Sequence, residues 1–179
     1  MKRPLGDKTT AEIGAIAEEK GCRLLAIETA GAGRFTVLRL VLERADGSAA
    51  TVDDCEAVSR EASVVLDAAD EIAHRYTLEV SSAGLDRKLY SLDDARRFVG
   101  RRVRVKTDDP VVPEARRETS GRTPALSPAR NFAGRLVSIE GDRLTVVDEL
   151  EHKTYNVRFG DIRLVRLDFE WPRREGPGR

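Results

Sequence analysis

The stretch YTLEVSSAGLDRKL, residues 76–89, joins a strand pattern to a turn of small residues and then to charge. Over its first six positions apolar and polar residues alternate, which predicts a strand with one apolar face. Ser81, Ser82, Ala83 and Gly84 then carry little side-chain bulk, and Gly84 can adopt a positive φ that most residues avoid. The stretch therefore predicts a strand that ends in a turn where the backbone of another molecule can approach closely.

Charged residues follow this turn directly. An arginine offers a planar fork of donors suited to phosphate or carboxylate, and a lysine offers a mobile point charge. Hydroxyls, amides and positive charge thus occur together, a combination that suits binding better than catalysis. The predicted partner-binding residues are Ser81, Ser82, Gly84, Asp86, Arg87 and Lys88. Plain turn chemistry without a binding role is the alternative.

This signature resembles that of the bacterial ribosome maturation factor RimP family, in which a Val-Ser-Ser-Pro-Gly strand end precedes a short charged stretch containing an arginine. The resemblance extends to Asp53-Asp54-Cys55, to Val58-Ser59-Arg60 and to the hairpin pattern of residues 132–147, so it covers most of the chain. Ala83 and Lys88 depart from the pattern, because family members commonly have proline there. Without proline the turn is less rigid, although its polarity is kept.

The resemblance implies a non-catalytic factor for maturation of the small ribosomal subunit. It implies transient binding to the immature small subunit, with contacts to ribosomal RNA and to the small-subunit ribosomal protein numbered twelve, and we expect a monomer. It also implies an SH3-like, or Sm-like, barrel in the second half of the chain.

Charge is distributed unevenly along the chain, although the formal net charge is zero. Residues 1–91 hold 12 Lys and Arg against 16 Asp and Glu, whereas residues 92–179 hold 19 against 15. This asymmetry suggests that the second half faces a polyanion and that the acidic first half is selective about docking or meets a basic protein. Two solvated surfaces without such roles are the alternative.

Cysteine usage and hydropathy point to the cytoplasm. Cys22 and Cys55 are too few and too far apart for a disulfide framework or a zinc site, and both lie within apolar patterns. We therefore expect buried thiols in a reducing compartment. Met1-Lys2-Arg3 is not followed by an apolar run, so no export signal is expected, and no window approaches the roughly 20 apolar residues needed to cross a bilayer.

The first half has the pattern of a small α+β domain, which we place at residues 1–91. Two capping-box spacings, Thr9 with Glu12 and Asp53 with Glu56, mark the starts of two amphipathic helices, which end near Gly21 and Ala69. The order of elements is helix, strand, strand, helix, strand, with both helices covering one side of a three-stranded sheet. The expected strands are Cys22–Thr29, Phe35–Arg44 and Tyr76–Ser81.

The second half, residues 92–171, has only short alternating runs after a short helix capped at Ser91. Gly141 marks a tight hairpin turn, and residues 159–162 resemble the single helical turn that often precedes the last strand of a small barrel. Five strands predict an all-β barrel. The expected strands are Arg101–Thr107, Phe132–Ile139, Leu144–Asp148, Thr154–Arg158 and Leu164–Trp171.

A stretch rich in proline and arginine, residues 108–130, interrupts the strands of the second half. It is too proline-rich for regular structure and unusually long for a loop, so we expect it to be disordered or functional. A mobile basic loop can neutralise phosphates on docking, and an inert insertion is the alternative. Residues 172–179 are expected to form a disordered tail.

A basic stripe is predicted on the first strand of the second half. Alternation places Val103 and Val105 inward and puts Arg102, Arg104 and Lys106 together on the outer face, as candidate contacts to RNA phosphates. Three phosphate contacts would give a log–log salt slope of about −2 to −3. An edge strand that carries charge to prevent aggregation is the alternative.

Catalysis finds little support, and no catalytic residue, metal or cofactor is predicted. His74 and His152 are isolated, and the sequence has no nucleophile elbow, paired-carboxylate motif or metal-ligand spacing. Gly31-Ala32-Gly33-Arg34 is interpreted as a hairpin linker, and Asp53, Asp54 and Glu56 as helix-capping residues. Two other functions stay open: a general RNA-binding or RNA-chaperone module, and an unrecognised hydrolase.

Overall fold

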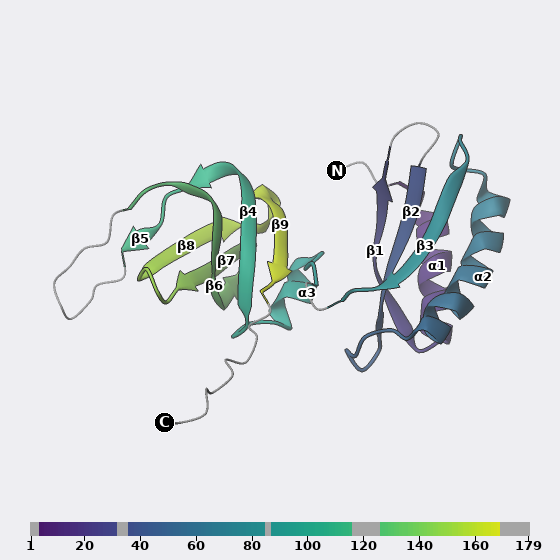
Figure 1. Ribbon diagram of the computed structural model, residues 1–179, viewed down its shortest axis with the longest axis horizontal. Coiled ribbons are helices and arrows are strands. Elements are labelled where there is room, and N and C mark those ends of the chain that lie inside the picture. The colour runs from purple at the N-terminus through teal and green to yellow at the C-terminus, as the bar shows by residue number, and fades with distance from the viewer. Residues whose placement is uncertain (1–3, 32–35, 85–86, 116–125, 169–179) are drawn as a thin grey trace, which may run out of the picture. The chain divides into compact units, whose positions relative to one another are not determined.

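The computed structural model of the protein describes residues 4–31, 36–84, 87–115 and 126–168 (Figure 1). Contacts within the chain divide it into two compact units, Met1–Gly84 and Leu85–Arg179. The sequence placed the division after residue 91, whereas residues 85–91 fall in the second unit of the structure. Each unit has its own hydrophobic core.

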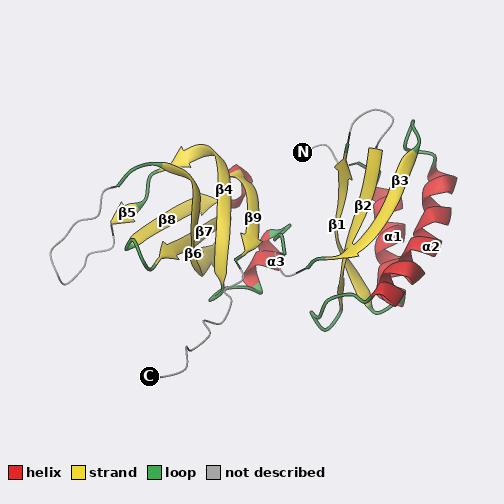
Figure 2. Cartoon of the chain, viewed as in Figure 1, coloured by secondary structure: helices red, strands yellow, loops and turns green. Residues whose placement is uncertain are grey.

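The N-terminal unit has the predicted α-β-β-α-β order. Its elements are α1 (Asp7–Glu19), β1 (Cys22–Ala30), β2 (Thr36–Arg44), α2 (Val52–Ala69) and β3 (Tyr76–Ser82). The sheet order is β1-β2-β3, in which β2 pairs antiparallel with β1 and parallel with β3. Both helices lie on the same face of this mixed sheet (Figure 2).

The core of the N-terminal unit lies between the two helices and the sheet. Ile13 and Ala17 lie one helical turn apart on α1, and Val58, Ala62 and Leu66 repeat at the same spacing on α2. These stripes meet the alternate residues Leu38, Leu40 and Leu42 of the central strand β2, all of which are fully buried. The apolar periodicities of the sequence thus meet in one core, as predicted.

Both predicted capping boxes are wrong in register. The N-cap of α1 is Gly6, without a side-chain cap, and the Thr9 hydroxyl instead donates a 2.6 Å hydrogen bond to Glu71. The N-cap of α2 is Thr51, which forms a capping box with Asp54. Several neighbouring polar residues could have served as the N-cap of α2. The 2.7 Å hydrogen bond from Arg44 Nε to Asp54 Oδ2 favours the Thr51–Asp54 box, because it links Asp54 to the end of β2.

The C-terminal unit is a short helix followed by an antiparallel sheet. Its elements are α3 (Leu92–Arg96), β4 (Arg102–Val111), β5 (Glu114–Ala115), β6 (Ala129–Glu140), β7 (Arg143–Asp148), β8 (Lys153–Arg158), the 3₁₀ turn η2 (Phe159–Asp161) and β9 (Ile162–Leu167). The strand order is β5-β8-β7-β6-β4-β9. The all-β organisation is therefore as expected. Within the described ranges no pairing joins the two outer strands, so closure of the sheet into a barrel stays a prediction.

Several local predictions for the C-terminal unit are confirmed. The Ser91 hydroxyl accepts a 3.0 Å bond from Asp94 N at the start of α3. Gly141 turns the chain between β6 and β7 with a φ of 59°, and η2 directly precedes the last strand. The structure adds a contact in the core of this unit, where the buried Phe132 stacks on Tyr155 with ring centroids 4.0 Å apart.

The proline-rich stretch is more regular than predicted. β4 continues through Pro110 to Val111, β5 pairs with β8 through Glu114 and Thr154, and β6 already begins at Ala129. The register of β4 against β6 shifts between Lys106 and Val111, an irregularity of the kind that admits a proline into a strand. Residues 116–125, the end of the last predicted strand at 169–171 and the tail at 172–179 lie outside the described residues.

Candidate functional site

The first half of the predicted turn belongs to the N-terminal unit. Ser81 and Ser82 are the last residues of β3, half-buried and paired with Val41 and Leu42 of β2. The sheet continues one bond further, because Ala83 N donates to the carbonyl oxygen of Leu42 at 3.1 Å. Gly84 is exposed, with a φ of 69° and no atom within 4 Å of where a Cβ would stand. The small-residue turn is therefore open, and its positive φ is as predicted.

The second half of the turn belongs to the C-terminal unit. Leu167 N donates to the Arg87 carbonyl at 2.8 Å and Leu89 N to the Val165 carbonyl at 2.9 Å, so the segment runs alongside β9. Lys88 is half-buried, and its backbone forms an isolated antiparallel β-bridge with that of Arg166. Asp86, the remaining predicted binding residue, lies outside the described residues. The predicted site is thus divided between the two units.

Arg87 corrects the expectation of an exposed fork of donors. Only 4% of this residue is exposed, and its guanidinium pairs with the carboxylate of Asp94 on α3. The same guanidinium lies over the ring of Phe98, 4.9 Å from its centroid. Its carboxylate partner also accepts a 3.2 Å bond from Tyr90 N. Arg87 therefore anchors the entry of the chain into the C-terminal unit, a structural role that the sequence reading did not assign.

The basic stripe has the predicted alternation. Val103 and Val105 are fully buried, whereas Arg104 and Lys106 are exposed and Arg102 is half-buried. β4 lies between β6 and β9, so it is not an edge strand, and protection of a free edge does not explain these charges. Lys106 makes no ion pair with any other residue that the structure describes.

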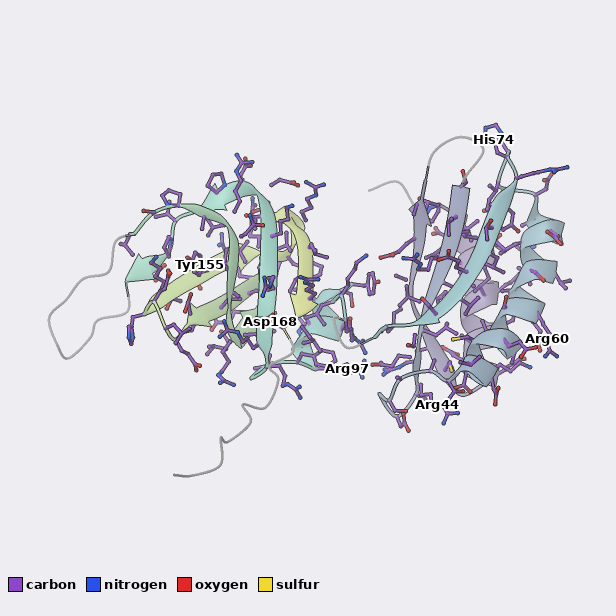
Figure 3. All side chains as sticks on the ribbon, viewed as in Figure 1. Arg44, Arg60, His74, Arg97, Tyr155 and Asp168 are labelled. Carbon is purple, nitrogen blue, oxygen red and sulfur yellow. The ribbon has the colours of Figure 1, made fainter. Side chains whose placement is uncertain are left out.

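Asp168, just beyond β9, holds two of the three stripe cations. Arg102 Nε donates to its Oδ2 at 3.0 Å, and Arg104 Nη2 donates to its Oδ1 at 3.1 Å. Figure 3 shows Asp168 beside the start of β4. Burial by itself would raise the pKa of this carboxyl, but the hydrogen bonds and positive charges of both arginines outweigh it, so the pKa is lowered. The carboxylate partly neutralises the stripe.

Cations from the neighbouring strands enlarge the same face. Residues directly opposite one another in an antiparallel ladder share a face, and Arg135 of β6 stands opposite Arg102, while Arg166 of β9 stands opposite Arg104. Arg135 is partly neutralised, because its Nε donates to Glu149 at 2.9 Å. We call Arg102, Arg104, Lys106, Arg135 and Arg166 the basic face.

Sequence reasoning missed Asp94, Asp168, Arg135 and Arg166. The pairing of β4 with β6 and β9 brings the last three to the stripe, and strand order is not visible in a local pattern. A signal did exist for Asp94, which stands three residues after the capping Ser91 and so had a predictable place at the start of a helix.

Among residues 4–31, 36–84, 87–115 and 126–168, no group of three or more His, Cys, Asp and Glu is placed to hold a metal ion. Within the same ranges, no helix has the length and apolar character needed to span a membrane.

Comparison with protein families places the N-terminal unit. Residues 12–86 match the family model described as the RimP N-terminal domain. The matched span runs from the first turns of α1 past the end of β3, and so includes the whole three-stranded sheet and the open turn that follows it. Residues 12–86 are therefore similar to the RimP N-terminal domain.

Proposed function

We propose that this protein binds the immature small ribosomal subunit transiently in the cytoplasm and assists its assembly without catalysing a reaction. The observation that carries the proposal is the match of residues 12–86 to the RimP N-terminal domain, followed in the same chain by a sheet with a basic face. Its proposed contacts are ribosomal RNA and the small-subunit ribosomal protein numbered twelve.

The charges of the two units support a division of labour. Residues 1–84 carry 10 Lys and Arg against 15 Asp and Glu, whereas residues 85–179 carry 21 against 16. RNA phosphates attract the positive unit and repel the negative one, while basic ribosomal proteins have the opposite preference. We therefore assign RNA contacts to the C-terminal unit and protein contacts to the N-terminal unit, with Ser81, Ser82, Gly84 and Lys88 as proposed contacts near the turn.

Arg104 and Lys106 are the best-placed RNA contacts of the basic face. The Arg104 side chain is 55% exposed although it shares Asp168, and Lys106 is exposed on the same side of β4. Two phosphate contacts would give a log–log salt slope of about −1.4 to −1.8, which helps docking but cannot hold a complex alone. We assign the rest of the affinity to the N-terminal unit. Because neither unit would hold the complex alone, loss of the contacts of one unit would release the protein from the subunit once assembly is complete.

Gradient sedimentation of cell extracts tests the proposal. The protein should sediment with free small subunits and not with assembled ribosomes. Arg104→Glu combined with Lys106→Glu should weaken this association, whereas Arg143→Glu combined with Arg158→Glu, which changes net charge equally on β7 and β8, should not. Sedimentation with every RNA-containing fraction would contradict the proposal and favour a general RNA-binding or RNA-chaperone module.

A further inference from the structure

The basic face of the C-terminal unit extends in two directions. Along β4, Arg102 and Lys106 are four residues apart, which spans about 13 Å on an extended strand. Across the sheet, β6, β4 and β9 lie side by side (Figure 2), so the face is three strands, or about 10 Å, wide. A ligand that matches this face therefore carries negative charge over an area and not only along one line.

The basic face is also rigid. β4 pairs antiparallel with β6 on one side and with β9 on the other. The side chains between its cations, Val103 and Val105, are fully buried in the core. A preorganised surface and a rigid ligand lose little conformational entropy on binding, whereas a flexible ligand loses the freedom of its own backbone. RNA that is already ordered as a double helix therefore suits this face better than a flexible single strand.

Among the described residues of β4, β6 and β9, no aromatic side chain lies on the basic face. Besides the five cations, the strand registers place Asn131, Ala133 and Leu164 on this side. Phe132, the aromatic residue of these strands, is buried in the core. Sheets that bind single-stranded RNA stack its bases on aromatic residues. The described part of the face instead offers contacts to the sugar–phosphate backbone.

Asp168 sets a threshold for the ligand of this face. Its carboxylate already accepts hydrogen bonds from Arg102 and Arg104, at 3.0 and 3.1 Å. A phosphate must compete with this carboxylate for the two guanidinium groups, and Asp168 also repels it, so one isolated phosphate gains little. A double helix presents about twice as many phosphates per unit length as either of its strands. Competition with Asp168 therefore favours a double helix.

We propose that the basic face binds double-stranded RNA through the sugar–phosphate backbones of both strands, without reading the base sequence. Double-stranded RNA is recognised mostly by shape and by phosphate and 2′-OH contacts across its wide, shallow minor groove. Cations on three adjacent strands can reach the backbones on both sides of that groove, and the exposed Asn131 adds an amide that can hydrogen-bond a 2′-OH. Only the choice of RNA as the ligand rests on the proposed function, and its double-stranded form is the further step.

A duplex of about 16 base pairs, the length that a double-stranded-RNA-binding domain covers, tests the proposal with the full-length protein. Fluorescence anisotropy compares this duplex with each of its strands alone, both of which lack self-complementarity. The duplex should bind at least about tenfold more tightly than either strand, which exceeds the gain of about twofold expected from its number of phosphates. A second duplex of different sequence should bind within about twofold of the first. Equal or tighter binding of a single strand, or a clear preference for one duplex sequence, would overturn the proposal.

Substitutions on β4 assign the binding to the basic face. Arg104→Gln combined with Lys106→Gln should weaken duplex binding and flatten its log–log salt slope by about 1.8, since each phosphate contact on a double helix contributes about 0.9. Arg143→Gln combined with Arg158→Gln is the matched control, because it removes the same charge from β7 and β8, outside the face. Equal slopes for the two variants would show that the duplex binds elsewhere and that the proposal is wrong.

An added aromatic residue distinguishes backbone contact from base stacking. Ala133→Tyr places a ring beside Arg104, its partner in the ladder, and should strengthen binding of single strands while weakening that of the duplex. Thr145→Tyr on β7 is the control, because Thr145 is also half-buried on a strand and lies outside the face, and it should alter neither affinity. Unchanged duplex binding by Ala133→Tyr would contradict the proposed contact.

Phe169 and Trp171, which follow Asp168 in the sequence, lie outside the described residues. Replacing both by alanine should leave duplex affinity unchanged, because contact with the sugar–phosphate backbone requires no stacking. Loss of duplex binding by this variant, with its circular dichroism spectrum unchanged, would assign recognition to stacking and defeat the proposal.

Two further results distinguish the form of the RNA from the proposed function. If the protein sediments with small subunits but prefers single-stranded RNA, the proposed function stands and the duplex site is wrong. If the protein prefers the duplex but does not sediment with small subunits, the proposed function fails and the duplex site stands.

Discussion

The guanidinium of Arg87 and the carboxylate of Asp94 form an ion pair inside the C-terminal unit, where 5% and 8% of the two side chains are exposed. Arg87 is the first described residue after Gly84, and the pair joins it to α3. The guanidinium also lies over the ring of Phe98. An arginine that follows a polar turn can therefore be a structural anchor and not a surface contact.

We expect Arg87→Ala to destabilise the C-terminal unit. Removing one partner of a buried ion pair leaves the other charge without compensation, which typically costs about 3–5 kcal/mol of unfolding free energy. Denaturant unfolding monitored by circular dichroism measures this loss. Arg96→Ala is the control, because Arg96 forms an exposed pair with Asp93 on the same helix and should change stability by less than about 0.5 kcal/mol. Unfolding of Arg87→Ala at the wild-type denaturant concentration would contradict a structural role.

Asp168→Asn should strengthen RNA binding. The substitution removes the carboxylate that holds Arg102 and Arg104, so both cations become available to phosphates. Each added phosphate contact steepens the log–log salt slope by about 0.7 for single-stranded RNA. Titration of a labelled RNA at several salt concentrations measures the slope. Asp161→Asn, which removes a carboxylate paired with Arg158 beside η2, should leave it unchanged. An unaltered slope for Asp168→Asn would remove the basic face from the RNA-binding argument.

Asp54→Asn should reduce the pH dependence of stability in the N-terminal unit. The side-chain hydrogen bond from Arg44, followed by bonds from Thr51, lowers the pKa of Asp54. A lowered folded-state pKa stabilises the protein above the unfolded value, near pH 4, and this stabilisation is lost as the pH falls toward the folded value. Wild type should therefore lose more stability than Asp54→Asn between about pH 5 and pH 2. Thermal melts across this range test the expectation, with Asp53→Asn as the adjacent control.

Gly134→Ala should destabilise the C-terminal sheet. A Cβ at Gly134 would collide with the backbone of Val147 on the neighbouring strand β7, which cannot move aside as a flexible side chain would. Overpacking of this kind typically costs about 1–3 kcal/mol. Gly160→Ala is the matched control, because no atom lies within 4 Å of its Cβ position. Equal midpoints of denaturant unfolding for the two variants would show that β6 and β7 can separate locally.

Local patterns predicted most of the elements. The stripes of α1 and α2, the alternation of β4 and the turn at Gly141 are all properties of neighbouring residues, so the sequence carries them directly. The continuation of β4 through Pro110 was not predicted. A shift in the register of β4 against β6 accommodates the proline, and amino-acid composition does not reveal such a shift.

The candidate site was less predictable than the fold. The chemistry of Arg87 suits both a phosphate and a buried carboxylate, and only the packing of α3 against the chain after the turn distinguishes them. The hydrogen bonds from Arg102 and Arg104 to Asp168 similarly require β9 to pair with β4, although Asp168 follows these arginines by more than sixty residues. Pairings between distant segments are set by the whole fold, so the charge of a residue predicts neither its exposure nor its partner.

The parallel pairing of β2 with β3 has a consequence for how the N-terminal unit forms during synthesis. β1 and β2 are adjacent hairpin strands, whereas Leu38 of β2 faces Leu78 of β3 only after the chain has passed through α2. Closing that larger loop costs more entropy and is slower, so we expect β3 to join the sheet last. While Ser82 is still inside the translating ribosome, the side of β2 that pairs with β3 would stay uncovered. Pairing of the completed β3 would then cover it.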